Sequence, residues 1–442
     1  MNSWVVKKLE NSQSVSRYSK SEEQLKKAEQ TIPLGSQTFS KSRFQYPIGI
    51  SPFYAERAKG AEIWDVDGNK YIDLVSSLAS ITLGYGDPEV ARAVKKQLPL
   101  GVSLSLPAKL EAEVSELIVE MVPSAEMVRF GKNGSDATSA AIRLARAFTG
   151  RDHIIVCGYH GWQDWFIGST TRNKGVPELV SSLTHKFEYN NIESLRAVLD
   201  TLEGKVAAVI MEPMNVAYPA PGFLEEVLVL THQAGGLLVF DETITGFRYA
   251  KGGAQELFGV TPDLSTFGKG LANGFPLSAI AGKREVMMEM EEIFFSGTFG
   301  GELLSLAAAK VVLQRHLRED VCSELSAIGQ DLSGRTEQAI AENRLEAVLK
   351  ISGHPSWRFL NWAATENYSV DEIKTFFMQE IFKRGVLVLS THNVTLAHTP
   401  RVIRKVSSVY DEVLSELHRA IESEALRDEL RVEPLKPLFK VR

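Results

Sequence analysis

The stretch Leu237-Leu238-Val239-Phe240-Asp241-Glu242 carries an apolar run directly into two carboxylic acids. Four consecutive apolar residues predict a strand that is buried on both faces, as in a parallel α/β sheet. An ionised carboxylate at the end of such a strand is costly unless it meets a cation. A protonated ring nitrogen would be such a cation, whereas a helix cap or a salt bridge to Arg248 is the ordinary alternative. Asp241 is therefore the first candidate site residue.

Similar apolar runs lie on both sides of this stretch. Between about residues 87 and 309, helices with a period of 3.6 alternate with short strands, a pattern typical of βαβ units and a mainly parallel sheet. The expected strands are 128–130, 153–157, 206–211, 237–240 and 264–267. The sequence thus predicts an α/β fold for the middle of the chain.

Further structure is expected outside this region. Residues 61–74 alternate apolar and polar side chains around the turn pair Asp67-Gly68, which favours a hairpin. A long amphipathic stretch at 302–341 precedes a second α+β unit. Its expected strands are 345–352, 357–363 and 386–389, and its expected helices are 370–383 and 400–423.

Length and composition set the domain expectations. With 442 residues and 44% hydrophobic content the chain exceeds one ordinary domain, so two lobes are expected. We predict an N-terminal segment with part of a small domain at 1–75, a large domain at 76–312 and a C-terminal small domain at 313–442. Residues 11–30 are polar, with a helical stretch at 22–30, and the first residues are expected to be loose or to pack against a partner.

Charge and cysteine usage exclude several classes of protein. The 49 Lys and Arg residues against 55 Asp and Glu give a net charge of −6, and the basic residues are spread along the chain, which does not support nucleic-acid binding. Cys157 and Cys322 suggest neither a disulfide framework nor a metal site. No apolar run approaches the roughly 20 residues that cross a bilayer, and residues 1–10 lack the apolar core of a secretory signal. We expect a cytoplasmic protein without membrane association or a metal.

Polar residues follow the predicted strands, where ligands of open α/β sheets bind. Asn133-Gly134-Ser135 opens a helix and is either an anion seat, through free N–H groups and the helix dipole, or a plain N-cap. Tyr159-His160-Gly161-Trp162 is either a cover for a flat heteroaromatic ligand or a packed aromatic corner. Glu212, the first carboxylate after 206–211, would anchor a loop or touch the ligand.

Lys269 follows the fifth predicted strand, 28 residues after Asp241 (269 − 241). It lies between Gly268 and Gly270 with apolar neighbours, and desolvation in such a confined place lowers the pKa of a lysine toward use as a nucleophile. Most lysines are charged groups on the protein surface. Lys269, however, follows an apolar strand and does not lie in the pattern of a surface helix, so a buried functional role is favoured.

Four motifs together are specific for one family. They are Trp64-Asp65-Val66-Asp67-Gly68-Asn69, Tyr159-His160-Gly161, Asp241-Glu242-Thr243-Ile244-Thr245-Gly246-Phe247-Arg248, and Lys269 at the family's spacing. With them, residues 32–423 resemble the class III, fold type I aminotransferases that depend on pyridoxal 5'-phosphate (PLP), and most of all the glutamate-1-semialdehyde 2,1-aminomutase branch. The resemblance implies a large, mainly parallel α/β/α sheet domain and a smaller α+β domain built from both chain ends.

The resemblance also implies catalytic roles. Lys269 would hold PLP as a Schiff base and shuttle a proton between cofactor and substrate carbons, and Asp241 would bind the ring nitrogen, which keeps the ring an electron sink. Tyr159 would stack on one ring face and Thr243 would contact the other.

A homodimer with shared active sites is implied as well, because members of the family are typically such dimers. Gly134 and Ser135 would bind the cofactor phosphate, joined by Thr298 from the neighbouring subunit.

Departures from the family pattern concern the substrate. Asn133-Gly134-Ser135 stands where the family usually has Ser-Gly-Thr, which keeps the glycine and a hydroxyl, and Trp162 replaces a frequent histidine. Lys41 stands where the aminomutase has an arginine for the substrate carboxylate, and lysine cannot form a planar bidentate clamp. Lys41, Trp162 and Glu212 are the candidate substrate contacts.

The variant pattern, including 161–165 (GWQDW) and 299–302 (FGGE), is similar to a subgroup often associated with surface-polysaccharide pathways. We therefore expect an aminotransferase that moves an amino group from an amino acid such as glutamate to a small keto or aldehyde acceptor, sugar-like or phosphorylated. The alternative is a glutamate-1-semialdehyde-type 2,1-aminomutase, which would use the same residues.

Two other classes are disfavoured. A hydride-transferring dehydrogenase would need G-x-G-x-x-G after a predicted strand, and Gly268, Gly270 and Gly274 have the wrong spacing. A non-catalytic binding protein of the same fold would be expected to lack the lysine, and both Lys269 and Asp241 are present.

Overall fold

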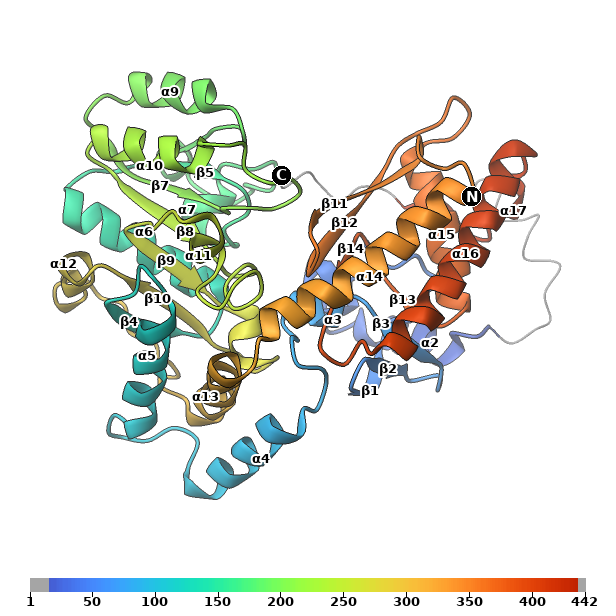
Figure 1. Ribbon diagram of the computed structural model, residues 1–442, viewed down its shortest axis with the longest axis horizontal. Helices are drawn as coiled ribbons and strands as arrows, with labels where there is room; N and C mark the ends of the chain where they lie inside the picture. Colours follow the sequence, from blue (N-terminus) through green and yellow to red (C-terminus); the bar gives the residue numbers. More distant parts are fainter. Residues whose placement is uncertain (1–15, 436–442) are drawn as a thin grey trace.

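The computed structural model describes residues 16–435, which form two lobes. The larger lobe contains a seven-stranded sheet in the order β4-β10-β9-β8-β7-β5-β6 (Figure 1). β10 runs antiparallel to both of its neighbours, and the other strands run in one direction. The strands are β4 (Met127–Gly131), β5 (His153–Cys157), β6 (Thr184–Lys186), β7 (Val206–Met211), β8 (Leu237–Asp241), β9 (Leu264–Phe267) and β10 (Ser278–Gly282).

Burial explains which of these strands the sequence predicts. All five apolar runs are strands of this sheet, and every residue of β7 and β8 is buried. β6 and β10 were not predicted, because β6 is only three residues long and β10 consists of small residues around a single isoleucine. The predicted fold class, a mainly parallel α/β/α sheet with a smaller α+β unit from both chain ends, is confirmed.

Helices cover both faces of the large sheet. One face carries α6 (Gly134–Thr149) and α12 (Arg284–Met287), whose apolar side chains pack on residues such as Ile210 and Val239. The other face carries α9 (Ile192–Thr201) and α10 (Phe223–Gln233), which pack on the alternate residues of the same strands. The remaining short helices of this region are α7 (Asp164–Ile167), α8 (Glu178–Ser181) and α11 (Ala254–Phe258).

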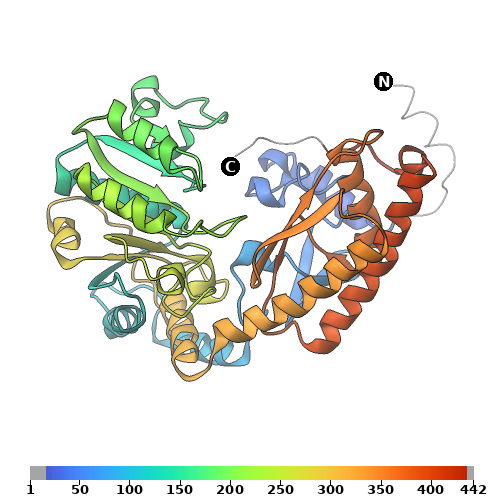
Figure 2. The same cartoon turned by 45° about the horizontal axis from the view of Figure 1, so that its top comes forward.

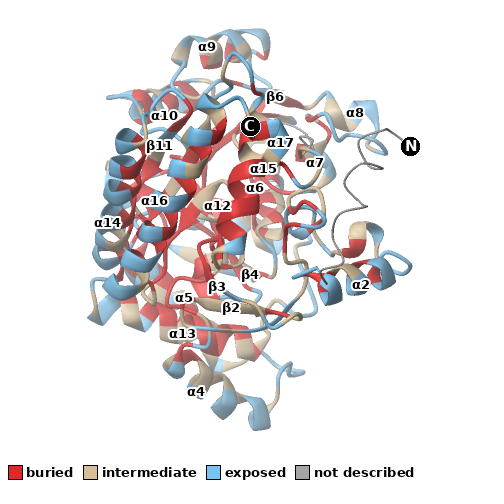
Figure 3. Cartoon of the chain, turned by 90° about the vertical axis from the view of Figure 1, so that its right-hand side faces the viewer, coloured by how far each residue is buried: buried red, intermediate tan, exposed pale blue. Residues whose placement is uncertain are grey.

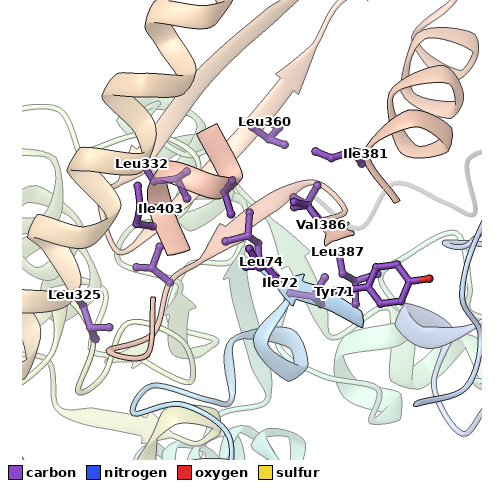
Figure 4. Close-up of a cluster of buried hydrophobic side chains, with 14 of the residues drawn as sticks. Tyr71, Ile72, Leu74, Leu325, Leu332, Leu360, Ile381, Val386, Leu387 and Ile403 are labelled. Atoms are coloured by element: carbon purple, nitrogen blue, oxygen red, sulfur yellow. The ribbon is translucent and has the colours of Figure 1, made fainter. Parts of the chain in front are cut away.

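The smaller lobe joins the two ends of the chain. Its four-stranded sheet has the order β1-β2-β3-β13, and a three-stranded sheet has the order β11-β12-β14. Figure 4 shows Tyr71, Ile72 and Leu74 from the first part of the chain beside Val386 and Leu387 from the last part. The strands are β1 (Ala55–Lys59), β2 (Glu62–Asp65), β3 (Lys70–Asp73), β11 (Leu349–His354), β12 (Trp357–Trp362), β13 (Val386–Leu387) and β14 (Thr391–Asn393).

The predicted hairpin is confirmed, since β2 and β3 pair in antiparallel fashion around Asp67-Gly68. The amphipathic stretch at 302–341 forms two helices, α13 (Leu303–Arg318) and α14 (Val321–Glu342), because the chain turns at Asp320, whose side chain caps the second helix. The other helices that frame the lobes are α2 (Ser19–Ala28), α4 (Pro88–Gln97), α5 (Lys109–Met121), α15 (Val370–Lys383), α16 (Pro400–Glu422) and α17 (Leu426–Glu429).

α14 and α16 lie side by side on the small lobe (Figures 1 and 2). Both helices carry buried as well as exposed residues (Figure 3), as expected of amphipathic helices on a core. α13 instead packs on α4 and α5, so the chain passes from the large to the small lobe between α13 and α14.

A left-handed turn, α3 (Ser76–Ala79), connects β3 to the large lobe. Its four residues have φ angles of 45°, 49°, 59° and 66°, and none is glycine. Each such residue costs about 1 kcal/mol, so surrounding bonds must stabilise the turn. Asp73 Oδ1 accepts the N–H groups of Val75 and Ser76, and the Asn393 side-chain amide donates to the Val75 carbonyl.

Within residues 16–435 no helix is long and apolar enough to cross a membrane. The expectation that the first residues are loose or pack against a partner concerns residues 1–15, which lie outside the described part of the chain.

Candidate active site

The carboxyl ends of β4, β5, β7, β8 and β9 meet at one edge of the large sheet and border a cavity of about 370 Å³. Eight of the ten predicted site residues line it: Gly134, Ser135, Tyr159, Trp162, Glu212, Asp241, Thr243 and Lys269. They converge because residues that follow parallel strands emerge at the same edge.

Asp241 is the last residue of β8 and is buried. His160 Nδ1 donates to its Oδ2 at 2.8 Å, and Oδ1 accepts both the Thr243 N–H and the Thr266 hydroxyl at 3.1 Å. Burial by itself raises the pKa of the Asp241 carboxyl, but these donors, His160 first, outweigh it and hold the pKa below its ordinary value. Asp241 is therefore a fixed anion that can pair with a cationic nitrogen.

Lys269 directly follows β9 and Gly268, at the start of the 3-10 turn η5 (Lys269–Ala272). Its φ of 40° lies in the left-handed region, a costly conformation for a lysine that is concentrated at functional sites. The loop after it is fixed by Asn273, whose side-chain oxygen accepts the N–H groups of Thr82 and Leu83 at 3.0 Å. The backbone thus holds this lysine at the cavity.

Thr243 packs closely against two glycines. A β-carbon at Gly134 would lie 3.0 Å from Thr243 Cγ2, and one at Gly268 would lie 3.2 Å from the same atom. The Thr243 hydroxyl is buried without a hydrogen-bond partner among the described residues. One wall of the cavity is thus close-packed and consists of the first turn of α6, the Thr243 side chain and the backbone before Lys269. The Thr243 hydroxyl in this wall is available to bind a ligand.

The ring cluster after β5 is both a packed corner and a wall of the cavity. His160 packs against Trp165 and Phe166, and the Tyr159 ring meets Phe166 edge to face. Gly161 has a φ of 106°, and a β-carbon there would lie 2.6 Å from Ser135 Oγ.

Trp162, by contrast, is 64% exposed at the cavity. Glu212 is buried and accepts the Tyr159 N–H and the Asn215 side-chain amide. Its position supports the loop-anchoring interpretation, and it also borders the cavity.

The other two predicted site residues, Lys41 and Thr298, line other cavities of the structure. Lys41 ends the 3-10 turn η3 (Phe39–Lys41) and lines a different cavity, on the small sheet beside Asp73 and Tyr85. Thr298 lines a third cavity with Leu104 and Leu106.

Two interactions at this edge were not predicted. The sequence marks His160 as an aromatic neighbour but does not indicate that it binds Asp241, 81 positions away. The alternative salt bridge from Asp241 to Arg248 is absent from the described residues, and Arg248 donates to backbone carbonyls instead. Its place at the end of the motif that begins with Asp241 does not indicate these bonds to distant carbonyls.

Comparison with known proteins identifies the family, since residues 47–421 match the class-III aminotransferases. The chain belongs to the class-III aminotransferase family. It is 31% identical over 404 residues to the 3-aminobutyryl-CoA aminotransferase of Cloacimonas acidaminovorans. That alignment covers 89% of this chain and 96% of the relative. It is 38% identical over 390 residues to the glutamate-1-semialdehyde 2,1-aminomutase 2 of Brevibacillus brevis, covering 81% and 90%.

Among solved structures, the FumI protein of Sphingopyxis sp. MTA144 with PLP superposes on this class-III chain with a TM-score of 0.85 at 28% identity, covering 94% of this chain and 98% of that protein. PLP is the cofactor of the family, and the cavity fits it. Asp241 is an anion for the ring nitrogen, the unpartnered Thr243 hydroxyl lies beside Gly134, and Lys269 supplies an amine.

The bond between His160 and Asp241 gives a test that depends on pH. His160→Leu removes the Nδ1 donor, so the pKa of Asp241 would rise. A carboxyl whose folded pKa lies below its unfolded value of about 3.9 adds stability that is present above that value and lost as pH falls through the folded pKa. In urea titrations of the cofactor-free protein we expect H160L to lose about 2 kcal/mol of unfolding free energy at pH 7, and less at pH 3.

Thr266→Val is the matched control, because it removes a neutral donor from the same carboxylate. It should cost about 1 kcal/mol at pH 7, with the same trend. A His160→Leu protein as stable as wild type at pH 7 would contradict the stabilising role of this bond.

Proposed function

We propose that this chain is a PLP-dependent aminotransferase that moves an amino group from an amino acid donor to a small keto or aldehyde acceptor. The observation that supports it most is that Lys269 and the anionic Asp241 line the same cavity at the sheet edge. The 3-aminobutyryl-CoA aminotransferase relative is consistent with this reaction class.

PLP, when bound, supplies an electron sink that stabilises negative charge at the substrate carbon next to the amine. Asp241 would keep the ring nitrogen protonated, because its carboxylate is held as an anion by His160, Thr243 and Thr266. Lys269 Nζ would bind the cofactor covalently and would move the proton between carbon atoms. Gly134 and Ser135 at the N-terminus of α6 would bind the phosphate, because free N–H groups and the helix dipole attract anions there.

The acceptor is proposed to be sugar-like or phosphorylated. Trp162 supports this, because an exposed indole at the cavity offers an apolar face for a ring while leaving polar groups in water. Lys41 lacks the planar guanidinium that clamps a carboxylate, and it lies against another cavity.

A 2,1-aminomutase is the second candidate, favoured by 38% identity to the Brevibacillus brevis aminomutase. It would use Asp241 and Lys269 in the same way and would return the amino group to the same molecule. The two reactions therefore differ in whether a keto acid leaves the enzyme.

A half-reaction separates these candidates. PLP-loaded protein incubated with L-glutamate or L-alanine should release one equivalent of keto acid per active site, detected by coupled dehydrogenase assay, and the visible cofactor band should be lost. Lys269→Ala should reduce the rate by at least about 10³-fold while the protein remains folded. Exchange confined to glutamate 1-semialdehyde, with no keto acid released from any amino acid, would contradict the aminotransferase and support the aminomutase.

We also propose that the enzyme is a homodimer whose partner contributes Thr298 to the phosphate site. An apolar patch supports this: within residues 98–106 of the single chain, Leu98, Leu100, Val102, Leu104 and Leu106 are all exposed. Thr298 borders the cavity that Leu104 and Leu106 line. A patch of this kind marks an interaction site in most proteins.

Leu106→Lys tests the dimer, because Leu106 is 78% exposed within the apolar patch. We expect this variant to shift toward monomer in analytical ultracentrifugation and to bind PLP about tenfold more weakly. Leu179→Lys, at a leucine that is 79% exposed on α8 outside the patch, should change neither quantity. A Leu106→Lys protein that stays dimeric and binds PLP normally would contradict the proposed interface.

A further inference from the structure

Arg248 has a fully buried guanidinium, with 1% of the residue exposed. Within residues 16–435 no carboxylate pairs with it, and its hydrogen bonds go to four backbone carbonyls. Burial lowers the pKa of Arg248 to about 10, so the group remains charged near neutral pH. A buried charge satisfied only by carbonyls is costly, which suggests a specific task.

The four carbonyls belong to three separate parts of the chain. Nη1 donates to Ser356 at 3.0 Å and to Val394 at 3.1 Å, both in the small lobe. Nη2 donates to Ala79 at 3.3 Å and to Ile81 at 3.4 Å. Arg248 itself follows β8, only seven residues after Asp241. The Arg248 side chain thus connects the segment after β8, the small lobe and the segment around Ser80.

Ser80 lies between the two carbonyls that Nη2 holds, and it lines the cofactor cavity. Its hydroxyl donates to the Ser77 carbonyl at 2.8 Å, which joins it to the left-handed turn α3. Ser77 and Leu78 of that turn line the neighbouring cavity of about 420 Å³ on the small sheet. The strained turn therefore borders the cavity on the small sheet, and Ser80, the residue directly after it, borders the cavity with Lys269.

We propose that Arg248 is a positioning residue for the reaction: it holds α3 in its left-handed conformation and so places Ser80 at the wall of the cofactor cavity. The inference rests on the proposed function of that cavity. Without the guanidinium, the positive φ angles of Ser77 and its neighbours would relax toward ordinary values, since L-residues disfavour this region.

Only arginine fits this position. Its planar group carries five N–H donors in a fixed fork, which can reach carbonyls of three segments at once, whereas a lysine ammonium has three donors at a single point. Arg248→Lys keeps the charge and most of the volume, so it tests the fork itself.

Hydrogen exchange measured by mass spectrometry is the direct test, in PLP-loaded protein without substrate. In R248K, peptides spanning residues 74–84 should exchange about tenfold faster than in wild type. Arg358→Lys is the matched control, because Arg358 of β12 also donates to a backbone carbonyl, that of Gly353, but does not bond the turn. It should leave those peptides unchanged.

Activity gives a second readout, as 2-oxoglutarate released from L-glutamate. R248K should lower kcat/KM by about tenfold or more, with PLP affinity changed by less than about threefold. In the R248K protein, a second substitution Ser77→Gly should raise kcat/KM at least about threefold, because glycine adopts positive φ without support. Ser77→Ala in the same protein should leave kcat/KM unchanged.

Three results would each overturn the proposal. They are unchanged exchange of residues 74–84 in R248K, a loss of activity in R248K no larger than that in R358K, and equal effects of glycine and alanine at position 77. If R248K does not fold, Ser80→Ala in the otherwise wild-type protein replaces it: a kcat/KM about fivefold lower with PLP retained supports the proposal, and an unchanged value overturns it. Wild-type protein that binds PLP but releases no keto acid would refute the aminotransferase reaction, and the exchange experiment would still decide the role of Arg248.

Discussion

A buried carboxylate must remain ionised at the end of a fully apolar strand, and the active site depends on this constraint. Asp241 meets it through His160, Thr243 and Thr266, which come from three different segments. Each donor is placed by an element of the large sheet: His160 follows β5, Thr266 lies in β9, and Thr243 follows β8 itself. The sheet therefore fixes the charge as well as the position of the group that we propose as the partner of the cofactor nitrogen.

Strain is concentrated around the same edge. Lys269 has a positive φ, and so do all four residues of the turn α3. The segments that follow them are bonded to each other, because Asn273, four residues after Lys269, accepts the N–H groups of Thr82 and Leu83. Arg248 adds the small lobe to the same network through Ser356 and Val394. Hydrogen bonds from Arg248 thus join the small lobe to the segment around Ser80, which borders the cavity.

Much of this could be predicted from the sequence because burial on two faces leaves continuous apolar runs. Such runs located β4, β5, β7, β8 and β9, and the residues after them supplied most of the cavity wall. β10 was missed because Ser278–Gly282 is made of small residues, which pack closely without an apolar signature. The bonds from His160 to Asp241 and from Arg248 to four carbonyls could not be predicted, since both join segments that only the tertiary fold brings together.

The covalent attachment of PLP at Lys269 is the central claim, and borohydride reduction tests it most directly. PLP-loaded protein should lose its visible absorbance on reduction, and peptide mapping should place one pyridoxyl group on Lys269. Protein that stays colourless with PLP, or a reduced group mapped to another side chain, would contradict the account.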